Sequence, residues 1–259
     1  MLRVENLTKI YDDGTIALKD VSFEVPDREF MVIIGLSGSG KSTLLRCINR
    51  LIEPTEGKIF WNDTDITAVE GDELRELRRH IGMIFQNFNL VYRSTVLKNV
   101  LSGRLGYVRP WNSLFNRWSK DDIERARAAL ERVGIPEKAD NRADELSGGQ
   151  QQRVGIARAL MQEPTMMLAD EPVASLDPVL AHSILGYLEQ LNQEEGITIL
   201  CSLHYLDLVQ RYATNVIGLR DGEIVFEGDN VAIREMDDDR FKQIYGEEAV
   251  RLNVGPDEA

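Results

Sequence analysis

The sequence is poor in cysteine and histidine. Its 259 residues include 2 cysteines and 3 histidines. The cysteines, Cys47 and Cys201, lie far apart, with neither the spacing of metal ligands nor the density of a secreted disulfide scaffold. We therefore expect a fold that forms without structural metals or disulfides and that suits a reducing cytosol.

Long hydrophobic runs are also missing. The longest, Phe30 to Ile34, is far too short to span a bilayer. Residues 1–5 lack the charged and apolar regions of a signal peptide. We therefore expect a protein that is soluble by itself and reaches a membrane only through a partner.

Positive charge is in deficit, since 30 Lys and Arg face 43 Asp and Glu and the net charge is −13. Proteins that bind the nucleic-acid backbone need a basic face to displace counterions. The charge therefore disfavours a nucleic-acid function. Acidic residues gather at 237–239 and 247–248, and we interpret them as a solvated surface.

The order of apolar segments is typical of an α/β fold. Alternating segments within residues 2–25 predict antiparallel strands around a turn. The run from Glu29 to Ile34, which is apolar after its first residue, leads into glycines and then a helical pattern, which predicts strand, loop and helix. From about residue 87 to 162 the pattern changes to helices broken by loops. Further strands are expected at 57–61, 81–85, 165–168 and 198–203, a helix at 178–193 and a hairpin over 216–226.

The loop from Gly35 to Ser42 fits the G-x-x-x-x-G-K-S/T pattern of a phosphate-binding loop (P-loop), with the strand before it and the helix after it that such a loop needs. Its glycines let backbone N–H groups turn toward phosphates, and the helix N-terminus adds a positive dipole. Lys41 can reach the β- and γ-phosphates, and Ser42 can ligate Mg²⁺. The predicted nucleotide contacts here are Gly35, Leu36, Ser37, Gly38, Ser39, Gly40, Lys41, Ser42 and Thr43.

A later apolar strand ends in two carboxylates, Asp170 and Glu171. Asp170 would hold Mg²⁺ through its water shell, while Glu171 would orient and polarise the water that attacks the γ-phosphate. Apolar strands that end in Asp-Glu are common on surfaces. Together with the P-loop, however, the pair indicates nucleotide hydrolysis.

The segment from Glu145 to Arg153 combines a helix N-cap with paired glycines. Ser147 can cap a helix that runs from Gln150 to about Met161, and the glycines allow a close backbone approach. Such a helix start is a second anion-binding position. Two of them in one chain mean either two phosphate sites or one site divided between two chains.

This segment resembles the signature sequence of ATP-binding-cassette (ABC) ATPases, and it precedes the Asp170-Glu171 strand as in that family. The resemblance implies an ATP-dependent homodimer in which the signature segment of one copy contacts the γ-phosphate held by the P-loop of the other. The residues that would contact nucleotide in trans are Ser147, Gly148, Gly149 and Gln150.

The other family motifs follow in order and cover nearly the whole chain. Tyr11 resembles the aromatic residue that stacks on adenine, and Gln86 resembles the Q-loop glutamine that touches Mg²⁺ and the attacking water. Residues 174–177 resemble the D-loop at the dimer seam, and His204 resembles the switch histidine that contacts the γ-phosphate and supports Glu171. The resemblance implies Glu171, His204, Lys41 and Gln86 as catalytic residues and Ser42, Gln86 and Asp170 as Mg²⁺ ligands.

The motifs and segments together predict an α/β fold: a P-loop NTPase core with a mainly parallel sheet, an N-terminal antiparallel β subdomain and an inserted helical subdomain. We expect a single ABC ATPase domain over residues 1–259. Within it, 1–86 and 163–245 form the nucleotide-binding core with the β subdomain, 87–162 form the helical subdomain with the signature segment, and 246–259 form a C-terminal tail.

A single cassette without a fused membrane span or a long coiled-coil linker favours a transporter subunit that docks on separate permease subunits at the cytoplasmic face of the inner membrane. An indirect partner would then be a solute-binding protein. Residues 87–145 lie where the family docks coupling helices, and about half of the aromatic residues there should instead pack inside. These aromatic residues are Tyr92, Tyr107, Trp111, Phe115 and Trp118.

The cargo cannot be read from the residues, because it binds other subunits. Three segments look like those of the ATPase subunits of bacterial phosphonate importers, namely residues 103–106, 111–115 and 168–178. Transporters of polar amino acids or methionine and lipoprotein-release systems stay open. If the chain were a regulatory ATPase acting on nucleic acid or ribosomes, we would expect tandem cassettes or a basic surface, and the sequence indicates neither. A monomeric P-loop kinase leaves residues 146–153 unexplained.

Overall fold

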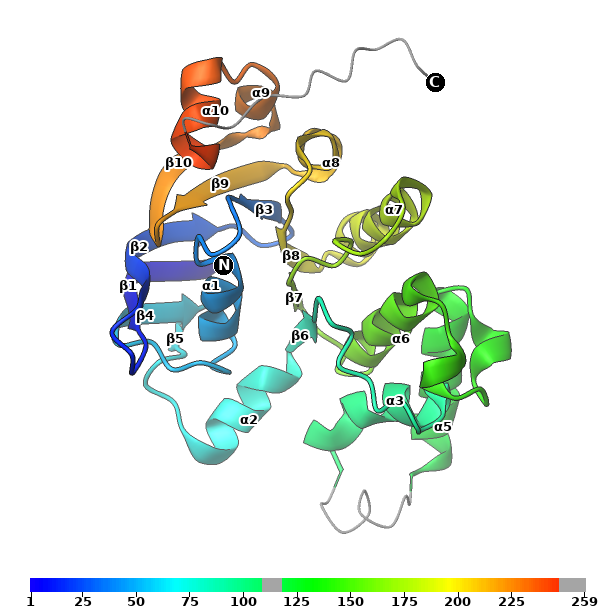
Figure 1. Ribbon diagram of the computed structural model, residues 1–259. Coiled ribbons are helices and arrows are strands. Elements are labelled where there is room, and N and C mark those ends of the chain that lie inside the picture. The colour runs from blue at the N-terminus through cyan, green and yellow to red at the C-terminus, as the bar shows by residue number, and fades with distance from the viewer. Residues whose placement is uncertain (109–117, 247–259) are drawn as a thin grey trace.

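Two β-sheets frame the structure, a computed structural model that describes residues 1–108 and 118–246 (Figure 1). A four-stranded sheet has the strand order β2-β1-β4-β5, and a six-stranded sheet has the order β10-β9-β3-β8-β7-β6. Helices cover the six-stranded sheet, and the predicted α/β class is confirmed.

The four-stranded sheet is antiparallel, as the alternating pattern predicts. β1 (Leu2–Ile10) pairs with β2 (Ile16–Val25) on one side and with β4 (Glu56–Trp61) on the other, and β5 (Thr64–Asp65) adds a short edge. Shifts in register interrupt the β1–β2 ladder after Val4. The turn after β1 carries Tyr11.

The six-stranded sheet is parallel except at one edge. β3 (Phe30–Ile34), β8 (Thr198–Ser202), β7 (Met166–Ala169) and β6 (Ile81–Ile84) run parallel, and so does β9 (Asn215–Arg220) beside β3. β10 (Glu223–Asp229) closes the edge as the antiparallel partner of β9. The carboxyl ends of parallel strands meet at one edge of a sheet, which is where such folds place their ligands.

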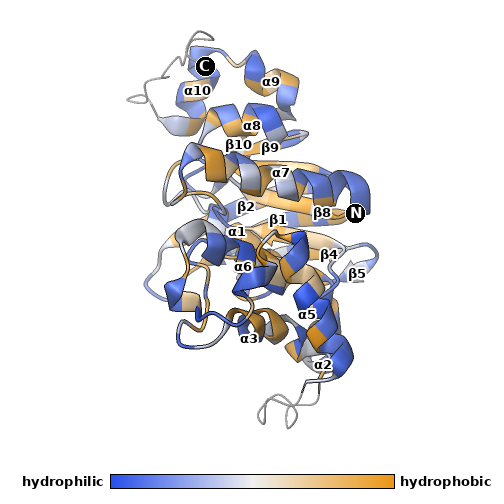
Figure 2. Ribbon diagram, turned by 90° about the vertical axis from the view of Figure 1, so that its right-hand side faces the viewer, coloured by the Kyte–Doolittle hydropathy of each residue, from blue (hydrophilic) through white to orange (hydrophobic). Residues whose placement is uncertain are grey.

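Both faces of the six-stranded sheet are buried, as continuous apolar strands require. Phe30, Val32 and Ile34 of β3 face a core shared with α6 and α7, while Met31 and Ile33 face a second core shared with α1 and the four-stranded sheet. α1 (Lys41–Ile48) is therefore packed between the two sheets. In Figure 2 the strands are mostly hydrophobic, whereas the outer helix α2 is mostly hydrophilic.

The stretch predicted as the helical subdomain is built of helices in its described part. Three of them pack against one another, namely α3 (Val96–Leu101), α5 (Lys120–Arg132) and α6 (Gly148–Leu160) (Figure 1). Helix α6 begins two residues before the predicted Gln150. The domain division of the chain stays a prediction. The other helical elements include α2 (Gly71–Arg79), η1 (Ser102–Gly106), η2 (Pro136–Lys138), η3 (Ala143–Glu145), α7 (Pro178–Glu195) and α8 (Leu206–Tyr212).

Two C-terminal helices, α9 (Asn230–Arg234) and α10 (Asp238–Tyr245), were not predicted. The acidic run at 237–239 begins α10. Asp237 is its N-cap and accepts a hydrogen bond from the backbone N–H of Arg240 at 2.8 Å. Acidic residues are favourable in a first helical turn, so this run has a structural role besides being exposed. The acidic pair 247–248 lies outside the described residues. Among the helices described, none combines the length and apolar character needed to cross a bilayer.

Both cysteines are buried as free thiols, Cys47 in α1 and Cys201 in β8. Burial raises the pKa of the Cys47 thiol to about 12 and also raises the pKa of Cys201. At pH 8 almost no thiolate forms, and the thiolate is the reactive species.

We therefore predict that neither thiol of the folded protein reacts with a disulfide reagent such as dithiobis(nitrobenzoate) at pH 8, while both react within minutes in guanidinium chloride. A Glu137→Cys variant is the matched control, because position 137 is exposed and should give one fast thiol in the folded state. Rapid reaction of either native thiol without denaturant would contradict the prediction.

Candidate functional site

The loop between β3 and α1 wraps around the side chain of Lys41. This side chain is only 3% exposed, and its Nζ donates hydrogen bonds to the carbonyls of Gly35 and Leu36, both at 2.8 Å. Burial lowers the pKa of Lys41, while the carboxylates of Glu171 and Asp170 act to raise it. An ammonium carries three N–H donors, so Lys41 can hold the loop and still offer one donor to a ligand.

Two glycines allow the loop to fold this tightly. Gly35 and Gly40 have φ angles of +145° and +106°. A Cβ atom on Gly35 would lie 2.2 Å from the carbonyl oxygen of Leu219, and one on Gly40 would lie 2.4 Å from that of Ala17. Only glycine fits such contacts. The rim of the loop, Leu36 to Gly38, is exposed, whereas the hydroxyl of Ser39 is buried without a hydrogen-bond partner among the described residues.

Asp170 follows β7 directly and is 0% exposed. Its Oδ1 accepts hydrogen bonds from the hydroxyl of Ser42 at 2.7 Å and from that of Ser202 at 3.4 Å. Its Oδ2 accepts one from Nη2 of Arg46 at 3.2 Å. The carboxylate thus connects the carboxyl ends of β7 and β8 to α1.

Glu171 has a left-handed backbone, with φ +48°, and its side chain has other partners than that of Asp170. Its backbone N–H donates to Ser202 Oγ at 2.8 Å. Gln86 Nε2 donates to Glu171 Oε2 at 2.8 Å, and His204 Nε2 contacts Oε1. Lys41 Nζ lies 4.0 Å from Oε1. Of the four residues predicted as catalytic, three therefore surround the carboxylate of the fourth, Glu171, although their roles stay predictions.

Tyr11 lies beside the P-loop helix. Its hydroxyl is 3.1 Å from Oγ1 of Thr43, and its exposed ring has Lys9 Nζ 5.4 Å from the centroid. The structure therefore brings the predicted adenine-stacking residue next to the predicted phosphate contacts.

The signature segment begins helix α6. Ser147 is the N-cap, as predicted, and its hydroxyl accepts from the N–H of Gln150 at 3.4 Å while the Gln150 side chain accepts from the N–H of Ser147 at 3.0 Å. Gly149 packs against Leu180 of α7, where a Cβ would come within 2.8 Å. Ser147 and Gly148 are exposed. No hydrogen bond among residues 1–108 and 118–246 joins 147–150 to the P-loop.

Ser202 and Arg46 belong to the site, but sequence reasoning missed both. The signal for Ser202 was a hydroxyl at the end of a mostly apolar strand, because a buried hydroxyl needs a partner. Arg46 could have been found from its spacing, since residues four apart share one face of a helix and Ser42 is four residues earlier.

The residues fit a magnesium nucleotide. Magnesium prefers oxygen ligands, and Ser42, Asp170 and Gln86 supply hydroxyl, carboxylate and amide oxygens. Phosphates suit a glycine loop that ends in a helix N-terminus with a buried lysine.

Comparison with known proteins gives a family and close relatives. The family described as "ABC transporter" matches residues 18–174. The chain is 54% identical to the phosphonates import ATP-binding protein PhnC of Bdellovibrio bacteriovorus, over 96% of this chain and 95% of that protein. It is 52% identical to PhnC of Staphylococcus aureus, over 95% of this chain and 94% of that protein.

Solved structures agree with this family. One is the dimeric, post-hydrolysis ATP-binding cassette MJ0796 bound to ADP and Pi, with a TM-score of 0.78, 35% identity and coverage of 89% of this chain and 99% of that one. Another is the ADP conformation of the cassette MJ1267, with a TM-score of 0.82, 35% identity and coverage of 94% and 97%.

The close approach at Gly40 gives a test of the loop geometry. A Gly40→Ala variant pays both for a positive φ and for a collision with the carbonyl of Ala17, whereas Gly14→Ala has φ +84° and nothing within 4 Å of its new Cβ. We predict that Gly14→Ala lowers the free energy of unfolding by about 1 kcal/mol and that Gly40→Ala lowers it by at least about 1 kcal/mol more. Urea denaturation measures both, and equal losses would contradict the geometry.

Proposed function

Because the chain belongs to the ABC transporter family of ATP-binding proteins, we propose that it is the ATP-hydrolysing subunit of an importer for phosphonates or related phosphorus oxyanions. The observation that carries hydrolysis is the set of contacts that Gln86, Lys41 and His204 make with Glu171. The proposed cargo rests on the similarity to phosphonate import proteins over nearly the whole chain.

In this proposal the chain positions ATP and activates water. The P-loop N–H groups and Lys41 hold the β- and γ-phosphates, and Tyr11 stacks on adenine. Glu171 accepts a hydrogen bond from the attacking water, while Gln86 and His204 hold the Glu171 carboxylate in place. Water attacks the γ-phosphorus and ADP leaves as the bond to its β-phosphate oxygen breaks. Ser42, Asp170 and Gln86 would hold Mg²⁺, which when bound neutralises phosphate charge.

The second half of each site would come from another copy of the chain. Ser147 and Gly148 form an exposed helix start, and no hydrogen bond among the described residues joins it to the P-loop of the same chain. Dimeric structures of a related cassette support the pairing. In a two-fold dimer, each signature segment would contact the γ-phosphate on the P-loop of the partner, so ATP would join the two copies.

The role of Glu171 can be tested by removing only its charge. We predict that Glu171→Gln lowers steady-state ATP turnover roughly 10²- to 10⁴-fold, because an amide accepts the water proton poorly, while ATP still binds and the protein still dimerises. Turnover, nucleotide binding and light scattering measure the three properties.

A Glu163→Gln variant is the matched control, since Glu163 is half exposed and pairs with Arg104 and Arg125 away from the site. It should hydrolyse ATP at the wild-type rate. Near wild-type turnover by Glu171→Gln would refute the assignment of Glu171.

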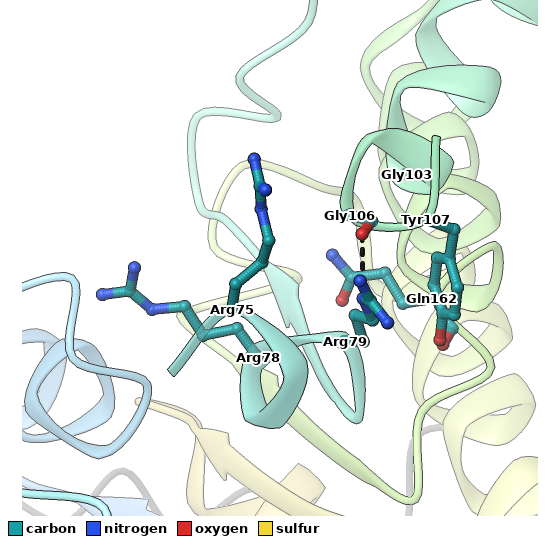
Figure 3. A pocket seen from close by; sticks show the side chains of 7 residues that line it. All are labelled: Arg75, Arg78, Arg79, Gly103, Gly106, Tyr107 and Gln162. Atoms are coloured by element: carbon teal, nitrogen blue, oxygen red, sulfur yellow. Dashed lines mark hydrogen bonds between the residues drawn. The ribbon is translucent and has the colours of Figure 1, made fainter. Parts of the chain in front are cut away.

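A groove between α2 and η1 is the proposed contact for the permease subunits (Figure 3). A cavity of about 220 Å³ is lined there by arginines of α2 and by the end of η1, and a neighbouring cavity of about 180 Å³ shares Arg78 and Gln162 with it. Exposed Leu51 lines the second cavity. Guanidinium groups beside apolar surface suit a helix that carries a carboxylate among apolar residues.

The aromatic residues predicted to dock the permease divide between surface and packing. Tyr107 forms a wall of the groove, where its ring lies 4.8 Å from Arg79 Cζ and 3.9 Å from Arg104 Cζ and its hydroxyl donates to the carbonyl of Gln162. Tyr92 is 48% exposed, whereas Trp118 packs against the core. The other two, Trp111 and Phe115, lie outside the described residues.

One double variant can remove both the positive charge and the exposed apolar side chain that the groove offers to a permease. We predict that the double variant Leu51→Glu with Arg75→Glu recovers at most about a tenth of the wild-type amount of coexpressed permease, because it places carboxylates where we propose that a carboxylate and apolar residues dock. Both positions are exposed, so ATP hydrolysis by the isolated subunit should not change.

The matched control is Arg125→Glu, which reverses the charge of an exposed arginine on α5. It should recover the permease fully. Wild-type recovery of the permease by the double variant would refute the groove as the docking site.

The assembly of the chain with its permease, reconstituted in lipid vesicles, also tests the cargo. A solute-binding protein loaded with a phosphonate should stimulate its ATPase, and one loaded with methionine should not.

A further inference from the structure

Arg46 makes an ion pair with the buried Asp170. The two side chains approach to 3.2 Å, and Asp170 is 0% exposed whereas the Arg46 side chain is 42% exposed. Ser42 and Arg46 are four residues apart on α1, so both reach the same carboxylate from one face of the helix. Ser42 meets Oδ1 and Arg46 meets Oδ2.

A carboxylate that is wholly out of water needs a compensating positive charge. Lys41 contributes from a distance, since Asp170 acts on the pKa of Lys41. Its ammonium, however, donates to the P-loop carbonyls. The cation in direct contact with Asp170 is the Arg46 guanidinium.

Arg46 is held weakly enough to leave. Among the described residues, Asp170 is the sole hydrogen-bond partner of its side chain, and the guanidinium already borders solvent. Water can replace that hydrogen bond on the arginine side. On the carboxylate side a divalent cation held near Asp170 can replace the charge of the guanidinium, because it carries two positive charges instead of one.

We propose that Arg46 is a positioning residue that stands in for the divalent cation at Asp170. It neutralises and orients the carboxylate while the site holds no metal, and it releases the carboxylate when magnesium enters with nucleotide. This inference rests on the proposed function of the site. Its consequence is that Arg46 competes with the metal and so limits how strongly magnesium strengthens nucleotide binding.

The test compares nucleotide affinity with and without magnesium. A fluorescent, non-hydrolysable ATP analogue is titrated into each protein in EDTA and in saturating Mg²⁺. The readout is the dissociation constant in EDTA divided by the dissociation constant in Mg²⁺. We expect Arg46→Met and Arg46→Gln each to increase this ratio roughly three- to tenfold over wild type, because they remove a positive charge beside the metal. Without metal and nucleotide, both variants should also melt at a lower temperature.

Arg46→Lys keeps the charge and should keep the wild-type ratio. Arg125→Met removes an exposed arginine that pairs with Asp121 on α5, and it is the control for loss of a surface ion pair. A purely structural role for Arg46 would weaken binding equally in both buffers and leave the ratio unchanged, which would overturn the proposal. An increase in Arg46→Lys as large as in Arg46→Met would also overturn it. If the wild-type protein fails to bind the analogue in either buffer, the proposed function fails instead.

Discussion

The buried carboxylate of Asp170 is the constraint on which the rest of the site depends. It lies at the end of β7 without access to water, so its oxygens must be satisfied by neighbours. Those neighbours come from α1 and from the end of β8, through Ser42 and Ser202. They can meet it only because β3, β8 and β7 are adjacent and parallel, with their carboxyl ends at one edge. The order of the strands therefore supplies the hydrogen-bond partners that the buried carboxylate needs.

The neighbouring Glu171 shows how the chain separates two adjacent carboxylates. A left-handed backbone costs energy for a residue other than glycine, and it persists where surrounding contacts hold it. Here the Ser202 hydroxyl accepts the N–H of Glu171 and donates to Asp170, so one buried group holds both residues. Asp170 then faces α1, while Glu171 faces Gln86 and His204. Two acids in sequence thus obtain different environments, as the roles that we propose for them, metal ligand and general base, require.

Sequence reasoning succeeded where the signal is local. The P-loop, the short apolar strands and the N-cap at Ser147 are each patterns within about ten residues, and the structure has the elements where they were predicted. It missed Arg46 as a partner of Asp170, which is 124 residues away. The spacing of Arg46 from Ser42 is a local signal, but the folded sheet is what brings Asp170 to that face of the helix. Helix α10 was missed for another reason. The acidic run at 237–239 was interpreted by charge alone, although an Asp N-cap followed by acidic residues is also a helix start.

Arg158 of α6 connects the helical part of the chain to the turn that follows Gln86. Its guanidinium donates to the carbonyls of Phe88 at 2.8 Å and Asn89 at 2.6 Å, just after Gln86, and burial lowers its pKa. Phe88 and Asn89 both have positive φ angles, so this turn is held by contacts rather than by backbone preference. A shift of Gln86 that carried Phe88 and Asn89 with it would move α6 or break these hydrogen bonds. Because Ser147 caps the start of α6, these contacts connect Glu171 to the surface at which we propose that a second copy binds.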